Sequence, residues 1–245
     1  MGWGNRRIRK FEQPALHNHH VTTTHFKCSA GFTVAISTLS ILQMPNVLIG
    51  ATGSVASIKI PQLVDLFLEI PDVSVKVVPT KAAHFFFTSE QVNAEICTDE
   101  QEWAMWAKKT DPVLHIDLRN WADVLVLAPL DANTLAKIAN GLCDNLLTCV
   151  LRAWNPIKPV IVCPAMNTNM WMHPFTARHL GVLQELLKFQ VISPISKTLA
   201  CGDTGIGAME EPAVIVAKVK EFIKNEKIGK SDIPKSEKLD EGSLI

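Results

Sequence analysis

The hydrophobic residues of this chain fall into short continuous runs that alternate with stretches of helical sequence. The runs predict β-strands at residues 46–49, 73–78, 123–128, 159–163 and 191–193. The stretches predict helices at residues 55–68, 132–142, 145–154, 175–187 and 212–225, and Pro61 is expected to kink the first of them. Because the strand runs do not alternate with polar residues, both faces of each strand should be buried. The pattern predicts an α/β fold, a doubly wound parallel sheet with helices on both faces.

The two ends of the chain differ from this body. Residues 1–43 carry five basic residues and one acidic residue, and they show no steady period. This composition fits an organellar transit peptide, a disordered extension or an upstream start before Met44. Residues 227–245 mix charged residues with Gly, Ser and Pro, which indicates a solvated, disordered tail. We therefore expect one domain over residues 44–226.

Composition excludes several classes of protein. With 47% hydrophobic and 20% charged residues, the chain is neither disordered nor fibrous. The net charge of zero gives no support to a nucleic-acid partner, and no apolar run is long enough to cross a membrane. The six cysteines form no Cys-x-x-Cys pair, so we expect no metal site. They are interpreted as reduced thiols of a cytoplasmic protein, unless residues 1–43 direct the chain to an organelle.

The loops after the first two strands could bind a phosphate. Gly53, Ser54 and Val55 open the first helix, where backbone N–H groups and the helix dipole favour an anion. The dinucleotide motif Gly-x-Gly-x-x-Gly is absent, and the second strand is followed by Thr80 and Lys81 rather than by an acid for a ribose hydroxyl. Together the loops favour a mononucleotide such as FMN over NAD, although an ordinary tight turn would explain the first loop alone.

A third loop and its flanking strand end read Ala128-Pro129-Leu130-Asp131-Ala132-Asn133-Thr134. In a doubly wound sheet this loop would lie at the same edge as the first two. Asp131 or Asn133 could equally be a simple helix N-cap.

Three other features could carry chemistry. His115 lies between two predicted elements, where a lone histidine is more often structural than catalytic. Asn167 and Met170 follow a buried strand, within a segment that is unusually rich in Met, Asn and Trp for a turn. Cys201 lies in a glycine-rich stretch that could form a mobile lid, on which a cysteine can reach a substrate.

These motifs, taken in order, resemble the homo-oligomeric flavin-containing cysteine decarboxylases. The substrate-recognition motif of that family is matched by Pro164, Met166, Asn167, Met170 and Trp171. The stretch from Ala200 to Met209 is similar to the lid of the branch that acts on phosphopantothenoylcysteine. The segment from His115 to Arg119 and the third loop match as well, so the resemblance covers about residues 45–226. Asn120 stands where many relatives carry a second arginine.

The resemblance implies a single Rossmann-like (flavodoxin-like) domain, FMN as cofactor and a homotrimer with sites between subunits. It implies FMN-dependent decarboxylation of 4′-phosphopantothenoylcysteine to 4′-phosphopantetheine in coenzyme A biosynthesis. The cysteine thiol of the substrate would be oxidised transiently to a thioaldehyde, which can accept the electrons that carbon dioxide leaves behind.

The resemblance also implies a role for each matching residue. His115 would act as acid or base, and Cys201 would protonate the enethiol. Asn167, Met170 and Arg119 would bind the substrate. FMN would be held by Gly53, Ser54, Val55, Thr80, Lys81, Ala128, Pro129, Leu130, Asp131, Asn133, Thr134 and Ala165.

Two other functions remain open at this level. A similar domain could serve as a flavin-binding regulatory subunit that inhibits a phosphatase, although the tail here lacks the long acidic run of such proteins. The substrate could also be the C-terminal cysteine of a peptide.

Overall fold

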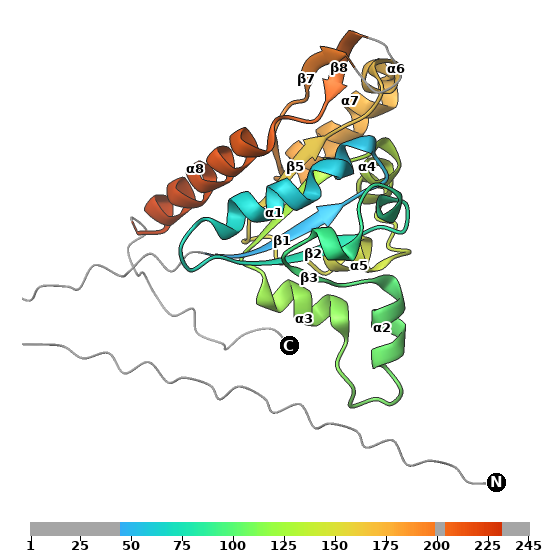
Figure 1. Ribbon diagram of the computed structural model, residues 1–245, viewed down its shortest axis with the longest axis vertical. Coiled ribbons are helices and arrows are strands. Elements are labelled where there is room, and N and C mark those ends of the chain that lie inside the picture. The colour runs from blue at the N-terminus through green and yellow to red at the C-terminus, as the bar shows by residue number, and fades with distance from the viewer. Residues whose placement is uncertain (1–44, 199–203, 232–245) are drawn as a thin grey trace, which may run out of the picture. The chain divides into compact units, whose positions relative to one another are not determined.

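The computed structural model describes residues 45–198 and 204–231 of the chain. These residues form a six-stranded sheet with the order β3-β2-β1-β4-β5-β6, in which every neighbouring pair is parallel (Figure 1). The strands are β1 (Asn46–Ala51), β2 (Ser74–Pro79), β3 (Glu95–Ile96), β4 (Val124–Leu130), β5 (Val160–Pro164) and β6 (Gln190–Val191). This strand order is that of the Rossmann fold, so the predicted doubly wound α/β architecture is confirmed.

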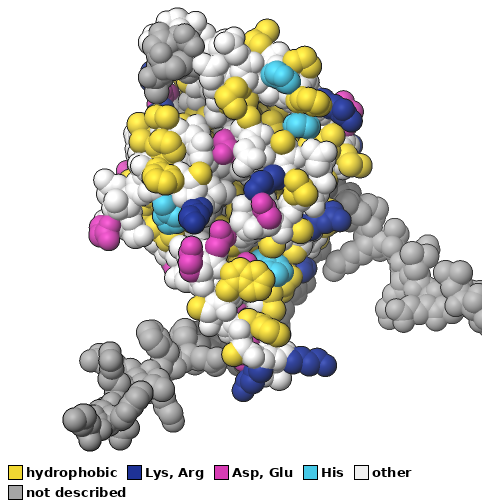
Figure 2. Space-filling model, turned by 90° about the vertical axis from the view of Figure 1, so that its right-hand side faces the viewer, with side chains coloured by type: hydrophobic (Ala, Val, Ile, Leu, Met, Phe, Trp, Pro, Cys, Tyr) yellow, Lys and Arg dark blue, Asp and Glu magenta, His cyan; other side chains and the backbone are white. Residues whose placement is uncertain are grey.

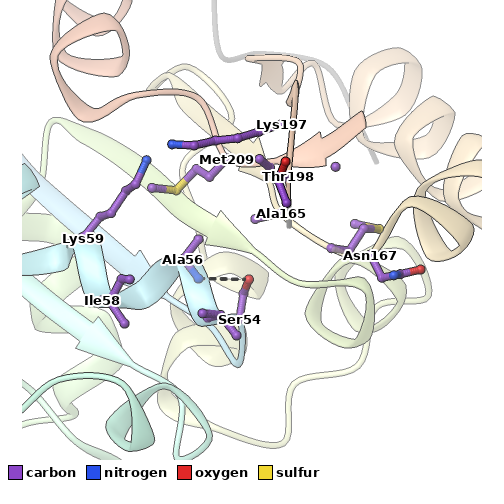
Figure 3. A pocket seen from close by; sticks show the side chains of 13 residues that line it. Ser54, Ala56, Ile58, Lys59, Ala165, Asn167, Lys197, Thr198 and Met209 are labelled. Atoms are coloured by element: carbon purple, nitrogen blue, oxygen red, sulfur yellow. Dashed lines mark hydrogen bonds between the residues drawn. The ribbon is translucent and has the colours of Figure 1, made fainter. Parts of the chain in front are cut away.

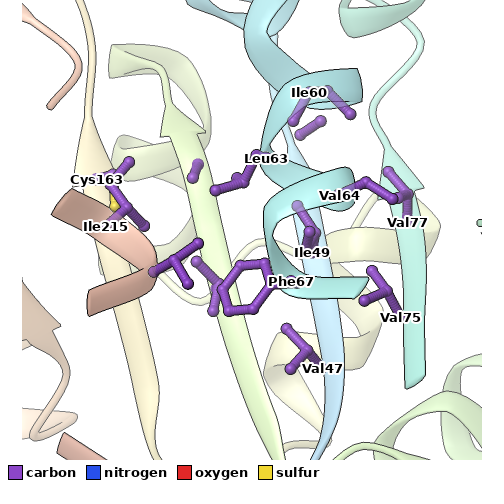
Figure 4. Close-up of a cluster of buried hydrophobic side chains, with 14 of the residues drawn as sticks. Val47, Ile49, Ile60, Leu63, Val64, Phe67, Val75, Val77, Cys163 and Ile215 are labelled. Carbon is purple, nitrogen blue, oxygen red and sulfur yellow. The ribbon is translucent and has the colours of Figure 1, made fainter. Parts of the chain in front are cut away.

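Helices cover both faces of the sheet. On one face α1 (Ile60–Leu68) and α8 (Pro212–Ser231) pack over Val47 and Ile49 of β1 (Figure 4). On the other face Leu48 and Leu125 pack against α3 (Leu114–Trp121), α4 (Ala132–Ala139), α5 (Leu146–Arg152) and α7 (Pro174–Gly181). Neighbouring residues of one strand therefore enter opposite cores, which explains the continuous apolar runs.

The sheet is closely packed at Gly50, near the carboxyl end of β1. A Cβ atom at this position would lie 2.5 Å from Cδ2 of Leu127 and 2.7 Å from Cδ1 of Leu147. Glycine is therefore required here by the close approach of α5 to the central strands, rather than by a turn.

Several element bounds differ from the sequence predictions. Residues Val55–Lys59 form a 3₁₀ helix, and α1 begins only at Ile60, so that Pro61 lies in its first turn, where proline is tolerated. The helix predicted at 175–187 is α7 followed by a π-helical turn at Val182–Leu186. The last helix is α8 (Pro212–Ser231), which continues beyond its predicted end at residue 225 and into the segment that was expected to be a tail.

Smaller elements had no prediction. They are β3, α3, α2 (Asp99–Met105), α6 (Thr168–Met172), two short 3₁₀ turns (Ala83–Phe85 and Ser89–Gln91) and the antiparallel hairpin of β7 (Ile195–Thr198) and β8 (Thr204–Ala208). Within the described residues no helix is both long and apolar enough to span a membrane. The expectations for residues 1–43 and 232–245 concern parts of the chain that lie outside the described residues.

Candidate functional site

The loops after β1, β2 and β4 meet at one edge of the sheet. Thr52, which follows β1, donates a hydrogen bond from Oγ1 to the carbonyl oxygen of Pro129 (2.9 Å) and accepts one from the amide of Asp131 (2.7 Å). A Cβ atom on Gly53 would lie 2.8 Å from Cβ of Ala82 and 3.0 Å from Oδ2 of Asp131. The three loops are thus in contact, as the doubly wound fold predicts for strand ends.

Two predicted cofactor residues also cap helices. Ser54 Oγ accepts from the amide of Ala56 at 3.4 Å, and Asp131 Oδ1 accepts from the amide of Thr134 at 2.6 Å. Asp131 is therefore the N-cap of α4, which was the simpler of its two interpretations. Asn133 is exposed on the first turn of this helix, and Thr134 is buried.

Thr80 is the residue of this edge whose side chain suits an anion best. Its Oγ1 is buried and has no hydrogen-bond partner among the described residues, although a buried hydroxyl normally has one. The backbone amide of Thr80 is held by the carbonyl oxygen of Ala51 at 2.8 Å, so its position is set by β1. The neighbouring Lys81 is exposed. A phosphate oxygen would satisfy the hydroxyl and lie near this ammonium group.

Ala128, Pro129, Leu130 and Ala165 are buried at the ends of β4 and β5. The carbonyl oxygen of Leu130 accepts from the amide of Ala165 at 2.9 Å, which joins the two strand ends. Most of their side-chain surface belongs to the core, so any contact of Ala128 or Leu130 with a cofactor would come mainly from the backbone.

A cavity of about 350 Å³ opens beside these loops (Figure 3). Four of the predicted site residues line it: Ser54, Val55, Ala165 and Asn167. The rest of the wall comes from the 3₁₀ helix Val55–Lys59, from Met166 and Met209, and from the β7–β8 hairpin, which contributes Lys197, Thr198, Gly207 and Ala208. The lining is mostly apolar, so the cavity suits a flat or aliphatic group with a few polar ends.

Gly207 brings the hairpin onto the end of β5. Its carbonyl oxygen accepts from the amide of Met166 at 2.9 Å, and its φ of +146° lies in a region that L side chains rarely adopt. A Cβ atom here would also lie 2.2 Å from the carbonyl oxygen of Met166. Glycine is therefore required both by the backbone conformation and by the close contact that covers the cavity.

Asn167 and Met170 are placed differently. Asn167 lines the cavity and is the N-cap of α6, where its Oδ1 accepts from the amide of Asn169 at 2.8 Å. The side chain of Met170, on the same short helix, is half exposed and does not line the cavity.

His115 lies in the first turn of α3 and does not line the cavity of its own chain. Its Nδ1 lies 2.5 Å from Oε1 of Glu102, a residue of α2 whose side chain is only 11% exposed. This contact leaves Nε2 of the imidazole as the atom available to a substrate. The ring keeps about a quarter of its surface exposed, so a group outside this chain can reach it.

Arg119 is on the same helix but at the other end. Its carbonyl oxygen, like that of Ala122, accepts from the ammonium group of Lys158, which precedes β5. The backbone of Arg119 therefore lies at the edge of the sheet where strands begin, whereas the cavity lies where they end. The structure does not bring Arg119 together with Asn167 within one chain.

Cys201 lies outside the described residues, between the two strands of the hairpin that covers the cavity. Two cysteines of the core are buried instead. Burial raises the pKa of Cys97 to about 11 and raises that of Cys163 further. Both therefore remain neutral thiols that pack as small hydrophobic side chains.

Some site residues had no signal in the sequence. Thr52, Glu102, Lys59 and Lys197 are polar residues of common types, and only their contacts across the fold distinguish them.

Comparisons with known proteins agree with this geometry. A model of the family described as Flavoprotein matches residues 36–224. A phosphopantothenoylcysteine decarboxylase of Mus musculus is 53% identical over 175 residues, which are 71% of this chain and 85% of the relative.

Two solved structures are similar to the whole described body. One is a Cys-to-Ser variant of phosphopantothenoylcysteine decarboxylase in complex with pantothenoylaminoethenethiol, with a TM-score of 0.71 and 53% identity. It matches 74% of this chain and 98% of its own. The other is the FMN-binding protein AtHal3, with a TM-score of 0.69 and 54% identity over 74% of this chain and 97% of its own.

Proposed function

The chain belongs to the Flavoprotein family, and on this premise we propose that it catalyses the FMN-dependent decarboxylation of 4′-phosphopantothenoylcysteine to 4′-phosphopantetheine, a step of coenzyme A biosynthesis. The observation that carries the proposal is the covered cavity at the strand ends, which joins the anion-binding loops to Asn167. Relatives named phosphopantothenoylcysteine decarboxylase are identical to this chain at more than half of the aligned residues.

The residues present fit a bound FMN. The buried hydroxyl of Thr80 can donate to the phosphate, together with the loop at Gly53 and Ser54, Lys81 and the start of α4 at Asn133 and Thr134. Val55 and Ala165 line the apolar cavity beside these groups. When bound there, FMN would supply the hydride acceptor that oxidation of a thiol-bearing carbon requires and, in its reduced form, the hydride that converts the enethiol to the thiol of the product.

Asn167 would hold the carboxylate of the substrate. Its amide nitrogen can donate to a carboxylate while its Oδ1 accepts from the amide of Asn169. A carboxylate held in this way lies beside the wall that Ala165 and Met166 form. Carbon dioxide then leaves into an apolar cavity in which a neutral product is favoured over the anion. Met170, on the same helix, would pack against the substrate from the exposed side of α6.

His115 would move the proton of the substrate thiol. Glu102 contacts Nδ1 and so presents Nε2, which can accept the proton of the thiol as that group is oxidised. Cys201, which follows β7 in the sequence and lies outside the described residues, would later give a proton to the carbon that has lost carbon dioxide. Because Arg119 lies at the opposite edge of the sheet, a contact of its side chain with the substrate would have to come from another subunit.

The separation of His115 from the cavity supports a homotrimer in which the site is completed between subunits. Around the contact of His115 with Glu102, Trp103, Met105 and Trp106 are 77%, 41% and 53% exposed. Figure 2 shows the side of the molecule that carries α2, with hydrophobic side chains in view near its lower end. Apolar patches of this kind are typical of surfaces that a second chain covers.

The purified protein tests the proposal directly. We expect a flavin absorption spectrum, FMN in the denatured supernatant and release of carbon dioxide from 4′-phosphopantothenoylcysteine. A Cys201→Ser variant should still release carbon dioxide but should accumulate the enethiol, measured by mass spectrometry. A flavin-loaded protein that releases no carbon dioxide would contradict the proposed function, and full product formation by the variant would remove Cys201 from the mechanism.

A further inference from the structure

Two lysines from distant parts of the chain enter the same end of the cavity. Lys59 is the last residue of the 3₁₀ helix after β1, and Lys197 lies on β7 of the hairpin. In Figure 3 both ammonium groups lie on the side of Met209, whereas Asn167 lies at the opposite side of the cavity. The cavity therefore has an amide end and a cationic end.

Glu211 holds the two lysines close together. Its Oε2 lies 2.8 Å from Nζ of Lys59, and its Oε1 lies 3.3 Å from Nζ of Lys197. These contacts, that of Lys59 first, lower the pKa of Glu211, so its carboxylate is ionised at neutral pH. Two cations and one anion leave a surplus of one positive charge at this end of the cavity.

The remaining donors of the lysines can reach a ligand. An ammonium group has three N–H donors, and the carboxylate of Glu211 takes one from each lysine. The side chain of Lys59 is 24% exposed and that of Lys197 is 56% exposed, so both are solvated and can turn toward the cavity. The rest of the described lining has no charged side chain. The end of the cavity at Lys59 and Lys197 therefore favours a dianionic group, whereas the rest of the lining does not.

We propose that Lys59 and Lys197 bind the 4′-phosphate of the substrate. This inference rests on the proposed function, because that substrate carries a carboxylate at its cysteine end and a phosphate at the other. Asn167 would take the first charge and the two lysines would take the second, so one extended molecule satisfies both ends of the cavity.

The phosphate of FMN has a different binding place. It suits the loops of Thr80 and Gly53, which meet Asp131 beside the start of α4. Lys59 lies at the far end of the 3₁₀ helix from Ser54, and Thr80 does not line the cavity. The two phosphates therefore do not compete for the same cations.

The lysines also connect the hairpin to the body of the domain. Lys197 belongs to the hairpin and Lys59 to the segment after β1. A phosphate that contacts both ammonium groups therefore links the hairpin to the body of the domain. A substrate that lacks the phosphate, such as the C-terminal cysteine of a peptide, forms no such bond. The subsite would therefore select the phosphorylated substrate over peptides.

The test compares 4′-phosphopantothenoylcysteine with pantothenoylcysteine, which lacks only the phosphate. A solved relative binds pantothenoylaminoethenethiol, so a ligand without phosphate can enter such a site. We expect the wild-type protein to prefer the phosphorylated substrate in kcat/KM. Lys59→Gln and Lys197→Gln should each reduce this preference about tenfold, mainly through the KM of the phosphorylated substrate.

Lys218→Gln is the matched control, because Lys218 pairs with Glu210 at 3.6 Å and does not line the cavity. It should keep the wild-type preference. Flavin content and thermal unfolding of each variant show whether it is folded, and affinities for 4′-phosphopantetheine and pantetheine measured by calorimetry give the same comparison without turnover.

Two results would overturn the subsite. One is a wild-type protein with the same kcat/KM for the two substrates, and the other is a pair of lysine variants in which kcat/KM falls equally for both substrates. Failure of the proposed function has another signature, since the flavin-loaded wild-type protein would then release carbon dioxide from neither substrate.

Discussion

At the scale of single residues, the contact between Glu102 and His115 decides which imidazole nitrogen can do chemistry. Glu102 is held on α2, and a second contact anchors the helix, since Asp99 Oδ1 accepts from the amide of Leu146 at the start of α5. The carboxylate is thus a positioning group with a well-defined place. A histidine oriented in this way is ready for proton transfer before a substrate arrives.

We expect Glu102→Gln to lower kcat about tenfold or more with little change in KM, because the imidazole loses its oriented partner while the cavity keeps its lining. Steady-state kinetics measure this effect, and ¹⁵N spectra of the imidazole should show a changed mixture of tautomers. Glu100→Gln removes an exposed carboxylate from the same helix and should behave as the wild-type protein. If kcat and the spectra of the Glu102 variant match the wild type, Glu102 does not position His115.

At the scale of elements, a close backbone contact docks the β7–β8 hairpin onto the end of β5. Gly207 meets the strand end at Met166 with a positive φ, and no larger residue has room there. The hairpin carries Lys197, so its docking places a proposed functional group beside the cavity. Its sequence contains glycines that indicate a lid, but not where the lid binds.

Gly207→Ala is expected to lower the free energy of unfolding by about 1–3 kcal/mol, because the residue is forced into a disfavoured conformation and contacts a backbone oxygen. Chemical denaturation measures the decrease in the free energy of unfolding. KM should rise, because the hairpin no longer docks at the cavity wall. Gly181→Ala is the control: this glycine is helical with φ −56° and no atom lies within 4 Å of a Cβ. It should be neutral or more stable by about 0.4–1 kcal/mol. Equal stability of the two variants would contradict this account of the hairpin.

At the scale of the whole molecule, the cavity and His115 lie apart within one chain. In a closed cyclic oligomer each chain can place its His115 beside the cavity of the neighbouring chain, so that every cavity receives one histidine. The exposed Trp103 and Trp106 beside His115 give this surface the composition of an interface.

Co-expression of two inactive variants tests the shared site. His115→Asn and Asn167→Asp should each be inactive alone, but mixed trimers should recover about a third of the wild-type activity, because about one cavity in three of a mixed trimer then has both residues intact. Different affinity tags on the two chains allow mixed oligomers to be isolated. Mixed oligomers without activity would place His115 and Asn167 of the same chain in one site.

The sequence by itself determined the parallel sheet and its ligand-binding edge. Val47, Leu48 and Ile49 are apolar in succession because the two faces of β1 pack into different cores. The burial of a strand is therefore visible in the residue types of that strand alone. Gly53, Thr80 and Asn167 were identified because each lies in the loop that follows a strand. The two-residue β3 and the glycine-rich hairpin were missed, since neither has enough apolar side chains to form a pattern.

Only the tertiary structure decided which polar residues act together. Lys59 and Glu211 are separated by 152 positions, and nothing near either residue indicates the other. Likewise, Glu102 meets His115 only because α2 packs against α3, and α3 carries the backbone of Arg119 to the edge of the sheet opposite the cavity. A hydrophobic pattern reflects the burial of each residue by itself, whereas a pair of charges depends on where the complete fold places both.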